Sequence, residues 1–72
     1  MGLEINTIIT LENNEKYQII NENLYNGKKY FLANNINSNT ETIFEEELEG
    51  LDIYVREVLD KEMYGSIIGL LK

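Results

Sequence analysis

The chain has 72 residues, with 13 acidic and 6 basic side chains and a formal net charge of −7. It contains no Cys and no His, which excludes a disulfide framework, a thiolate zinc site and acid–base catalysis by imidazole. Since 43% of the residues are hydrophobic, the chain is too apolar for a disordered acidic tail. These numbers predict one small acidic domain over residues 1–72, without a cofactor.

No segment of the sequence is apolar enough to cross a bilayer, and no basic stretch precedes an apolar block near Met1. We therefore expect neither a membrane span nor a signal peptide, and a cytoplasmic location. A domain of this length buries only about 60% of the surface that its unfolded chain exposes. A partner chain or a second copy is a way to complete such a small core.

The first four-fifths of the sequence predict five β-strands, at residues 3–11, 16–22, 28–35, 40–46 and 51–58. Asn26-Gly27, between the second and third strands, is the preferred pair for a type I′ hairpin turn. Apolar residues on both faces of 28–35 predict a central strand that is covered on both sides. Because the connections are short, a sequential antiparallel meander is the simplest topology.

The last residues change to a helical period, and Asp60 stands where an N-cap is expected. The sequence therefore predicts a helix over 61–71, packed on the sheet in a small α+β fold. Its apolar stripe consists of Leu59, Met63, Ile67, Leu70 and Leu71, and Tyr64 and Ile68 widen it. Gly65 and Gly69 each cost about 1 kcal/mol relative to Ala inside a helix, so a weak strand over 64–71 remains an alternative. In a helix, their four-residue spacing would allow a close approach to the sheet.

Four segments together resemble a known family: residues 9–17, 25–33 and 43–46, and the closing residues 60–64, which lead into Ile67 to Leu71. They are similar to motifs of the YrzB-like family of small acidic bacterial proteins of unknown function. The resemblance covers nearly the whole chain and implies a short antiparallel sheet with a C-terminal helix, in a cytosolic protein of bacterial or phage origin. It implies no catalytic residues. The chain departs from the family at Gly65 and Gly69, where charged helix-forming residues are common.

The negative charge is concentrated in residues 41–62, which hold nine acidic and two basic side chains. One interpretation is a solvated face that keeps the protein soluble. Another is an electronegative surface that binds a basic partner, and weak cation binding is a third. An EF-hand is excluded, because the alternating ligands around a Gly are missing. The candidate partner-binding residues are Glu45, Glu46, Glu47, Glu49 and Asp52.

Basic and catalytic side chains are sparse. Only Lys28 and Lys29 are adjacent, and Arg56 is expected to pair with a nearby Glu, so direct nucleic-acid binding is not expected. No carboxylate stands in an apolar segment that would tune its pKa for catalysis, and we expect no enzymatic activity. The five tyrosines are expected to be half-buried, with Tyr25 the most exposed because it borders a turn.

The sequence thus predicts a non-enzymatic module that binds a protein with a basic surface or associates with itself. The alternative is an acidic inhibitor, of a kind encoded by some phages, that blocks a nucleic-acid-binding enzyme by imitating its substrate. The two differ in how much of the binding depends on charge.

Overall fold

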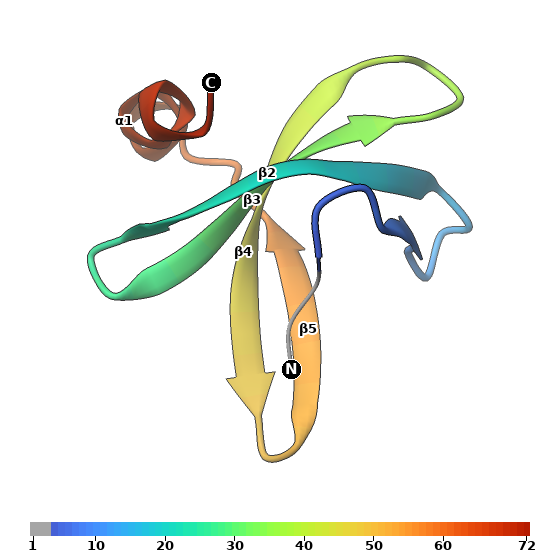
Figure 1. Ribbon diagram of the computed structural model, residues 1–72, viewed down its shortest axis with the longest axis horizontal. Coiled ribbons are helices and arrows are strands. Elements are labelled where there is room, and N and C mark those ends of the chain that lie inside the picture. Colours follow the sequence, from blue (N-terminus) through green and yellow to red (C-terminus); the bar gives the residue numbers. More distant parts are fainter. Residues whose placement is uncertain (1–3) are drawn as a thin grey trace.

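The computed structural model describes residues 4–72, which form a five-stranded sheet and one C-terminal helix (Figure 1). The strands lie in the sheet in chain order, and every neighbouring pair is antiparallel. The predicted α+β meander with a closing helix is therefore confirmed. The elements are β1 (Ile8–Thr10), β2 (Lys16–Tyr25), β3 (Lys28–Asn35), β4 (Glu41–Glu49), β5 (Asp52–Glu57) and α1 (Lys61–Leu71).

Two tight turns join neighbouring strands of the sheet. Asn26 (φ 53°) and Gly27 (φ 81°) connect β2 to β3, and positive φ at both positions is what a type I′ turn requires. The hairpin predicted from Asn-Gly is confirmed. Gly50 (φ 64°) begins the turn between β4 and β5. The break expected at Glu49-Gly50 lies one residue later, because Glu49 still pairs with Asp52.

The first strand is much shorter than the alternation predicts. The prediction of a strand over 3–11 is wrong at its start, because Asn6 has φ 75° and bends the chain before β1. The Thr7 amide donates to the Glu4 carbonyl across this bend at 3.1 Å. Leu3, the first residue of the predicted strand, lies outside the described residues.

The other boundaries differ by a few residues. β2 continues to Tyr25 rather than ending at 22, and β4 continues to Glu49 rather than ending at 46. Both strands extend because the hairpin partner that follows each of them continues to pair up to the turn. β5 is one residue shorter at each end than the predicted 51–58.

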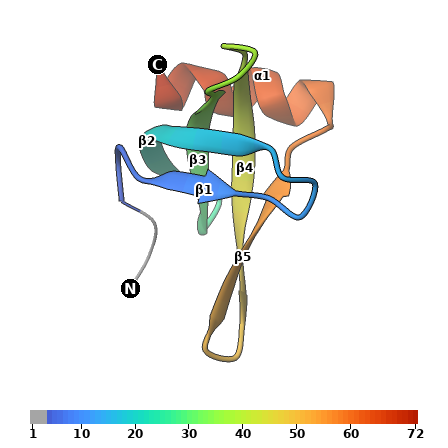
Figure 2. The same cartoon turned by 90° about the vertical axis from the view of Figure 1, so that its right-hand side faces the viewer.

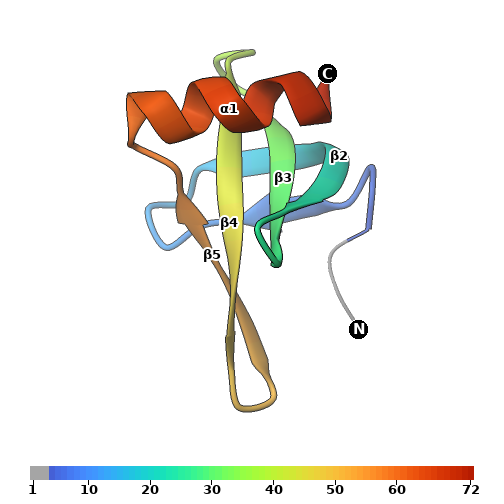
Figure 3. The same ribbon diagram turned by 90° about the vertical axis from the view of Figure 1, so that its left-hand side faces the viewer.

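A bend in β2 folds the sheet into layers. The register of β2 against β3 shifts between Ile19 and Asn21, and such a bulge bends and twists a strand. As a result, β1 and the first half of β2 cross one face of β3 and β4, whereas α1 covers the opposite face (Figures 2 and 3). β3 and β4 are therefore the middle layer of three.

Apolar side chains are buried on both faces of this middle layer, as predicted for the strand over 28–35. Burying one such side chain fully is worth about 1.5–3 kcal/mol. The cluster under α1 consists of Tyr30, Leu32, Ile43, Val58, Ile67 and Leu71. The second cluster, on the β1 side, consists of Ile19, Phe31, Ala33 and Phe44, with Ile9, Leu11, Tyr17 and Val55 packed against it.

The predicted helix is confirmed, and the alternative strand over 64–71 is wrong. The Asp60 side chain caps α1 by accepting hydrogen bonds from the Glu62 and Met63 amides at 2.9 and 3.3 Å. At the other end, the amide side chain of Asn21 donates to the Leu71 carbonyl at 2.8 Å. In the part of the chain that the structure describes, no helix has the length and apolar content needed to cross a membrane.

The face of α1 that packs on the sheet is narrower than the predicted stripe. Leu59 precedes the helix and is exposed, and Leu70 is also exposed, because neither side chain points toward the sheet. The predicted close approach at Gly65 and Gly69 is wrong as well. A Cβ built on either glycine would have no neighbour within 4 Å among residues 4–72, so both glycines face solvent.

Candidate protein-binding surface

The β4–β5 hairpin extends beyond the rest of the sheet (Figures 1 and 2). β3 pairs with β4 only as far as Tyr30 and Glu45, whereas β4 and β5 continue to pair up to Glu49 and Asp52. We call residues 46–55 the ribbon. Within the described part of the chain, no third strand pairs with the ribbon. A two-stranded segment of this kind leaves both of its edges without a strand partner.

Strand alternation divides the candidate acidic residues between the two faces of the hairpin. Glu46 lies opposite Val55 in the register and therefore shares the face of the second core cluster. The other four candidates share the face of Ile43, which belongs to the cluster under α1, and they are Glu45, Glu47, Glu49 and Asp52. The five predicted residues are thus close in the hairpin without forming one continuous patch.

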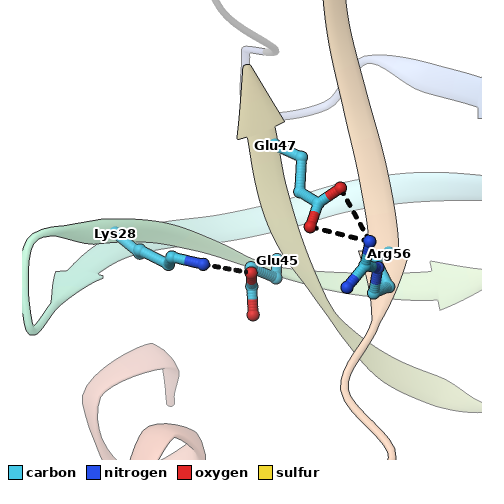
Figure 4. Close-up of polar contacts among 4 residues, drawn as sticks. All are labelled: Lys28, Glu45, Glu47 and Arg56. Carbon is cyan, nitrogen blue, oxygen red and sulfur yellow. Dashed lines mark hydrogen bonds and ion pairs between the residues drawn. The ribbon is translucent and has the colours of Figure 1, made fainter. Parts of the chain in front are cut away.

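Two of these carboxylates are held by cations (Figure 4). The Lys28 Nζ lies 2.7 Å from Glu45 Oε1, and one guanidinium nitrogen of Arg56 lies 2.9 Å from both carboxylate oxygens of Glu47. The expected pairing of Arg56 with a Glu is confirmed. Lys29 also pairs with a carboxylate, Glu22, at 3.6 Å. The lysines beside the Asn-Gly turn therefore contact acidic side chains of neighbouring strands.

The ion pair between Lys28 and Glu45 also affects ionisation. The hydrogen bond to Glu45, followed by the charge of that carboxylate, raises the pKa of Lys28 above its usual value of 10.5. Beneath the pair, Tyr30 is buried. Burial, and then the nearby Glu45 carboxylate, raise the pKa of the Tyr30 phenol above 10.0. Both shifts extend the protonated forms of Lys28 and Tyr30 to more alkaline pH.

The free negative charge lies toward the end of the ribbon. Among residues 4–72, no ion pair involves Glu46, Glu49 or Asp52. Glu49 and Asp52 are directly opposite each other beside the turn, and like charges in this position repel each other. A cation supplied by a partner would relieve this repulsion, whereas Glu45 and Glu47 already have partners within the chain.

Large apolar side chains are exposed at the same end of the hairpin. The exposed fractions are 69% for Leu48, 103% for Leu51 and 51% for Tyr54. Ile53, opposite Leu48 in the register, is also exposed. An exposed apolar group surrounded by polar side chains marks an interaction site more often than a scattered surface residue does. The sequence interpretation missed this group.

The missed group had a partial signal in the sequence. A two-residue turn at Gly50 forces the four residues before it to pair with the four after it, and the predicted third strand is too short to pair along all of them.

The prediction that Tyr25 is the most exposed tyrosine is wrong. Tyr54, in the ribbon, is the exposed tyrosine, whereas Tyr25 is half-buried and packs edge-on against Tyr30 at 6.2 Å between ring centroids.

A polar recess of about 460 Å³ separates the ribbon from the β2–β3 turn. It is lined by Gly27 and Lys28 on one side and by residues 46–49 on the other.

Across residues 4–72, no group of three or more acidic side chains is arranged to hold a metal ion. The geometry of the hairpin therefore combines exposed apolar surface, free carboxylates and an unpaired strand edge.

Comparisons with protein-family models, with curated proteins and with solved structures found no match. The resemblance to the YrzB-like family therefore stays a prediction. The functional proposal rests on the ribbon itself.

Proposed function

We propose that this chain is a non-enzymatic protein-binding module, which uses the ribbon to contact a partner with a basic surface or a second copy of itself. The observation that carries the proposal is the exposure of Leu48 and Leu51 beside free carboxylates at the end of the hairpin. Burying these two leucines against a partner would stabilise the complex by about 1.5–3 kcal/mol for each side chain.

The free carboxylates define the chemistry of the partner. Glu49 and Asp52 repel each other in the free protein, and a Lys or Arg placed between them would be attracted by both. Charge complementarity of this kind mainly raises the association rate and the specificity, and it weakens with salt. A partner with an apolar spot surrounded by basic side chains fits both features.

Other observations support a binding role rather than catalysis. The chain has no His and no Cys, and the free carboxylates at the end of the ribbon, Glu49 and Asp52, are exposed to solvent rather than enclosed in an apolar pocket. The resemblance to a family of small acidic proteins implies a cytoplasmic location and no catalytic residues. We propose no cofactor and no direct contact with nucleic acid or membrane.

The alternative function is an acidic inhibitor that imitates nucleic acid. That function requires a dense array of free negative charge. The free carboxylates at the end of the ribbon favour it. The ion pairs of Glu45 and Glu47 with Lys28 and Arg56 reduce the free charge, and this supports the protein-binding proposal.

The test is affinity capture from a lysate of the native host, followed by mass spectrometry and sedimentation of the purified protein. We expect the double variant Leu48→Asn/Leu51→Asn to lose the partner, or the self-association, that the wild-type chain shows. Leu59→Asn is the matched control, because Leu59 is equally exposed but lies outside the ribbon. Identical capture by all three proteins would contradict the proposal. The alternative function would be favoured if reversing the charge of the ribbon carboxylates abolished inhibition of a nucleic-acid-binding enzyme and the leucine variant left that inhibition unchanged.

A further inference from the structure

A groove of about 610 Å³ lies between β1 and β5, the two edge strands of the sheet. Residues 9–13 line one side and residues 53–55 line the other. Ile9, Leu11 and Val55 pack against the second core cluster and give the groove an apolar floor. Its volume is within the range of roughly 300–1,000 Å³ typical of clefts that bind ligands.

The backbone of β5 presents free hydrogen-bonding groups to this groove. The Val58 amide donates to the Ile43 carbonyl of β4 at 2.9 Å. Because alternate residues of an antiparallel strand direct their N–H groups to opposite sides, the amides of Ile53, Val55 and Glu57 point away from β4. Within the described residues, no strand pairs with this outer edge of β5. An extended chain can therefore add to it.

Carboxylates surround the apolar floor. Glu12 lines the groove directly. Glu46 is the cross-strand neighbour of Val55, and Glu57 lies two residues farther along the same face of β5. Among residues 4–72, no Lys or Arg lines the groove. The site therefore combines an apolar floor, an unpaired strand edge and negative charge.

We propose that this groove binds an extended segment of a partner protein that carries basic and apolar side chains on the same face, at every second position. The segment adds to β5 as a sixth strand. Because Val55 and Glu57 share one face of β5 and Glu46 lies opposite Val55 on that face, the apolar side chains that meet Val55 and the basic side chains that meet the carboxylates point the same way. Main-chain hydrogen bonds provide affinity in this mode, and alternate side chains provide specificity. This inference rests on the proposed function, since it specifies how a basic partner is bound.

Charge distinguishes this occupant from a second copy of the chain. A second copy also carries a net charge of −7, and pairing through β5 would bring two sets of the same carboxylates together. A basic segment is attracted by those carboxylates. The charge around the groove therefore favours a basic peptide.

The test uses a fluorescein-labelled peptide with blocked ends, Thr-Lys-Thr-Val-Thr-Lys-Thr, whose Lys and Val side chains share one face of the strand, and measures binding by fluorescence anisotropy. Ile53→Pro removes one outward amide and no hydrogen bond to β4, because proline is tolerated at a strand edge whose N–H faces away from the sheet. We expect it to weaken binding about tenfold, whereas Ile53→Val keeps the amide and the affinity. Circular dichroism verifies that both variants fold. The corresponding peptide with Glu in place of both Lys residues is expected not to bind.

Two further measurements identify the site. Hydrogen exchange followed by NMR should show new protection of the Ile53, Val55 and Glu57 amides when the peptide is added. Glu46→Gln combined with Glu57→Gln should weaken binding and reduce its salt dependence. Glu62→Gln, on the exposed side of α1, is the matched control and should leave the affinity and its salt dependence unchanged.

Several results would overturn the strand-addition proposal. They are the absence of binding by the Lys-containing peptide, binding that Ile53→Pro leaves unchanged, and protection of the β5 edge that grows with protein concentration in the absence of peptide. The last result would show that a second copy covers β5. If Leu48→Asn/Leu51→Asn abolishes partner capture but Ile53→Pro does not, the proposed function stands and strand addition is wrong. If neither variant changes capture, the proposed function fails as well.

Discussion

Replacing Gly65 and Gly69 with Ala should stabilise the protein. Both glycines lie inside α1, and a Cβ added at either would contact no neighbour within 4 Å among the described residues. Neither has a positive φ, so alanine adopts the same backbone without strain. Glycine is about 0.8–1.0 kcal/mol less favourable than alanine in a helix interior. Since the two sites are independent of tertiary contacts, the double variant should gain roughly 2 kcal/mol.

This gain is measurable by thermal unfolding followed by circular dichroism. A change of 1 kcal/mol shifts Tm by about 4–8 °C in a domain of 60–100 residues, so the double variant should melt roughly 8–16 °C higher than the wild type. Each single variant should provide about half of the shift. Ser66→Ala, on the same exposed side of the helix, is a control for the smaller effect of ordinary helix propensity. An unchanged or lower Tm for the double variant would refute the reasoning, because it would mean that the glycines allow a close contact.

Three further predictions concern the core, a loop and pH. Ile67→Ala should destabilise the fold by about 2–5 kcal/mol in urea unfolding, since Ile67 is fully buried, whereas a loss below 1 kcal/mol would contradict the packing of α1. Asn35→Ala should lower the free energy of unfolding by about 1–3 kcal/mol, because the buried Asn35 side chain accepts hydrogen bonds from the Asn37 and Ser38 amides. An unchanged urea-unfolding midpoint would refute this role. Because the pKa of Tyr30 is raised in the folded protein, its contribution to stability should be complete below pH 10 and should be lost as the pH rises through the folded-state pKa. Unfolding titrations of Tyr30→Phe should show a smaller alkaline loss of stability than those of the wild type. A wild-type profile that is already flat at alkaline pH would contradict this prediction.

The features that the sequence predicts well are local. Asn26-Gly27 selects a hairpin turn through backbone preference alone, and Asp60 selects the start of α1 through its side-chain cap. The apolar residues on both faces of 28–35 predict a covered central strand, and both core clusters confirm this. These signals depend on neighbours within a few residues, so they survive in any tertiary context.

The features that the sequence does not predict are long-range. The bulge between Ile19 and Asn21 decides which face of the sheet β1 covers, and no residue there signals it. Asn21 donates to the end of a helix 50 residues away, a contact that only the folded chain reveals. The candidate site was half predicted for the same reason. Its carboxylates were found from the distribution of charge, whereas the exposure of Leu48 and Leu51 depends on where the pairing of β3 with β4 stops, at Tyr30 and Glu45.

The most direct test of the binding surface is a hydrogen-exchange footprint of the chain with its captured partner. The account predicts slower exchange across residues 46–55 when the partner binds, with α1 unchanged. Protection confined to α1, with the ribbon exchanging as in the free protein, would contradict it.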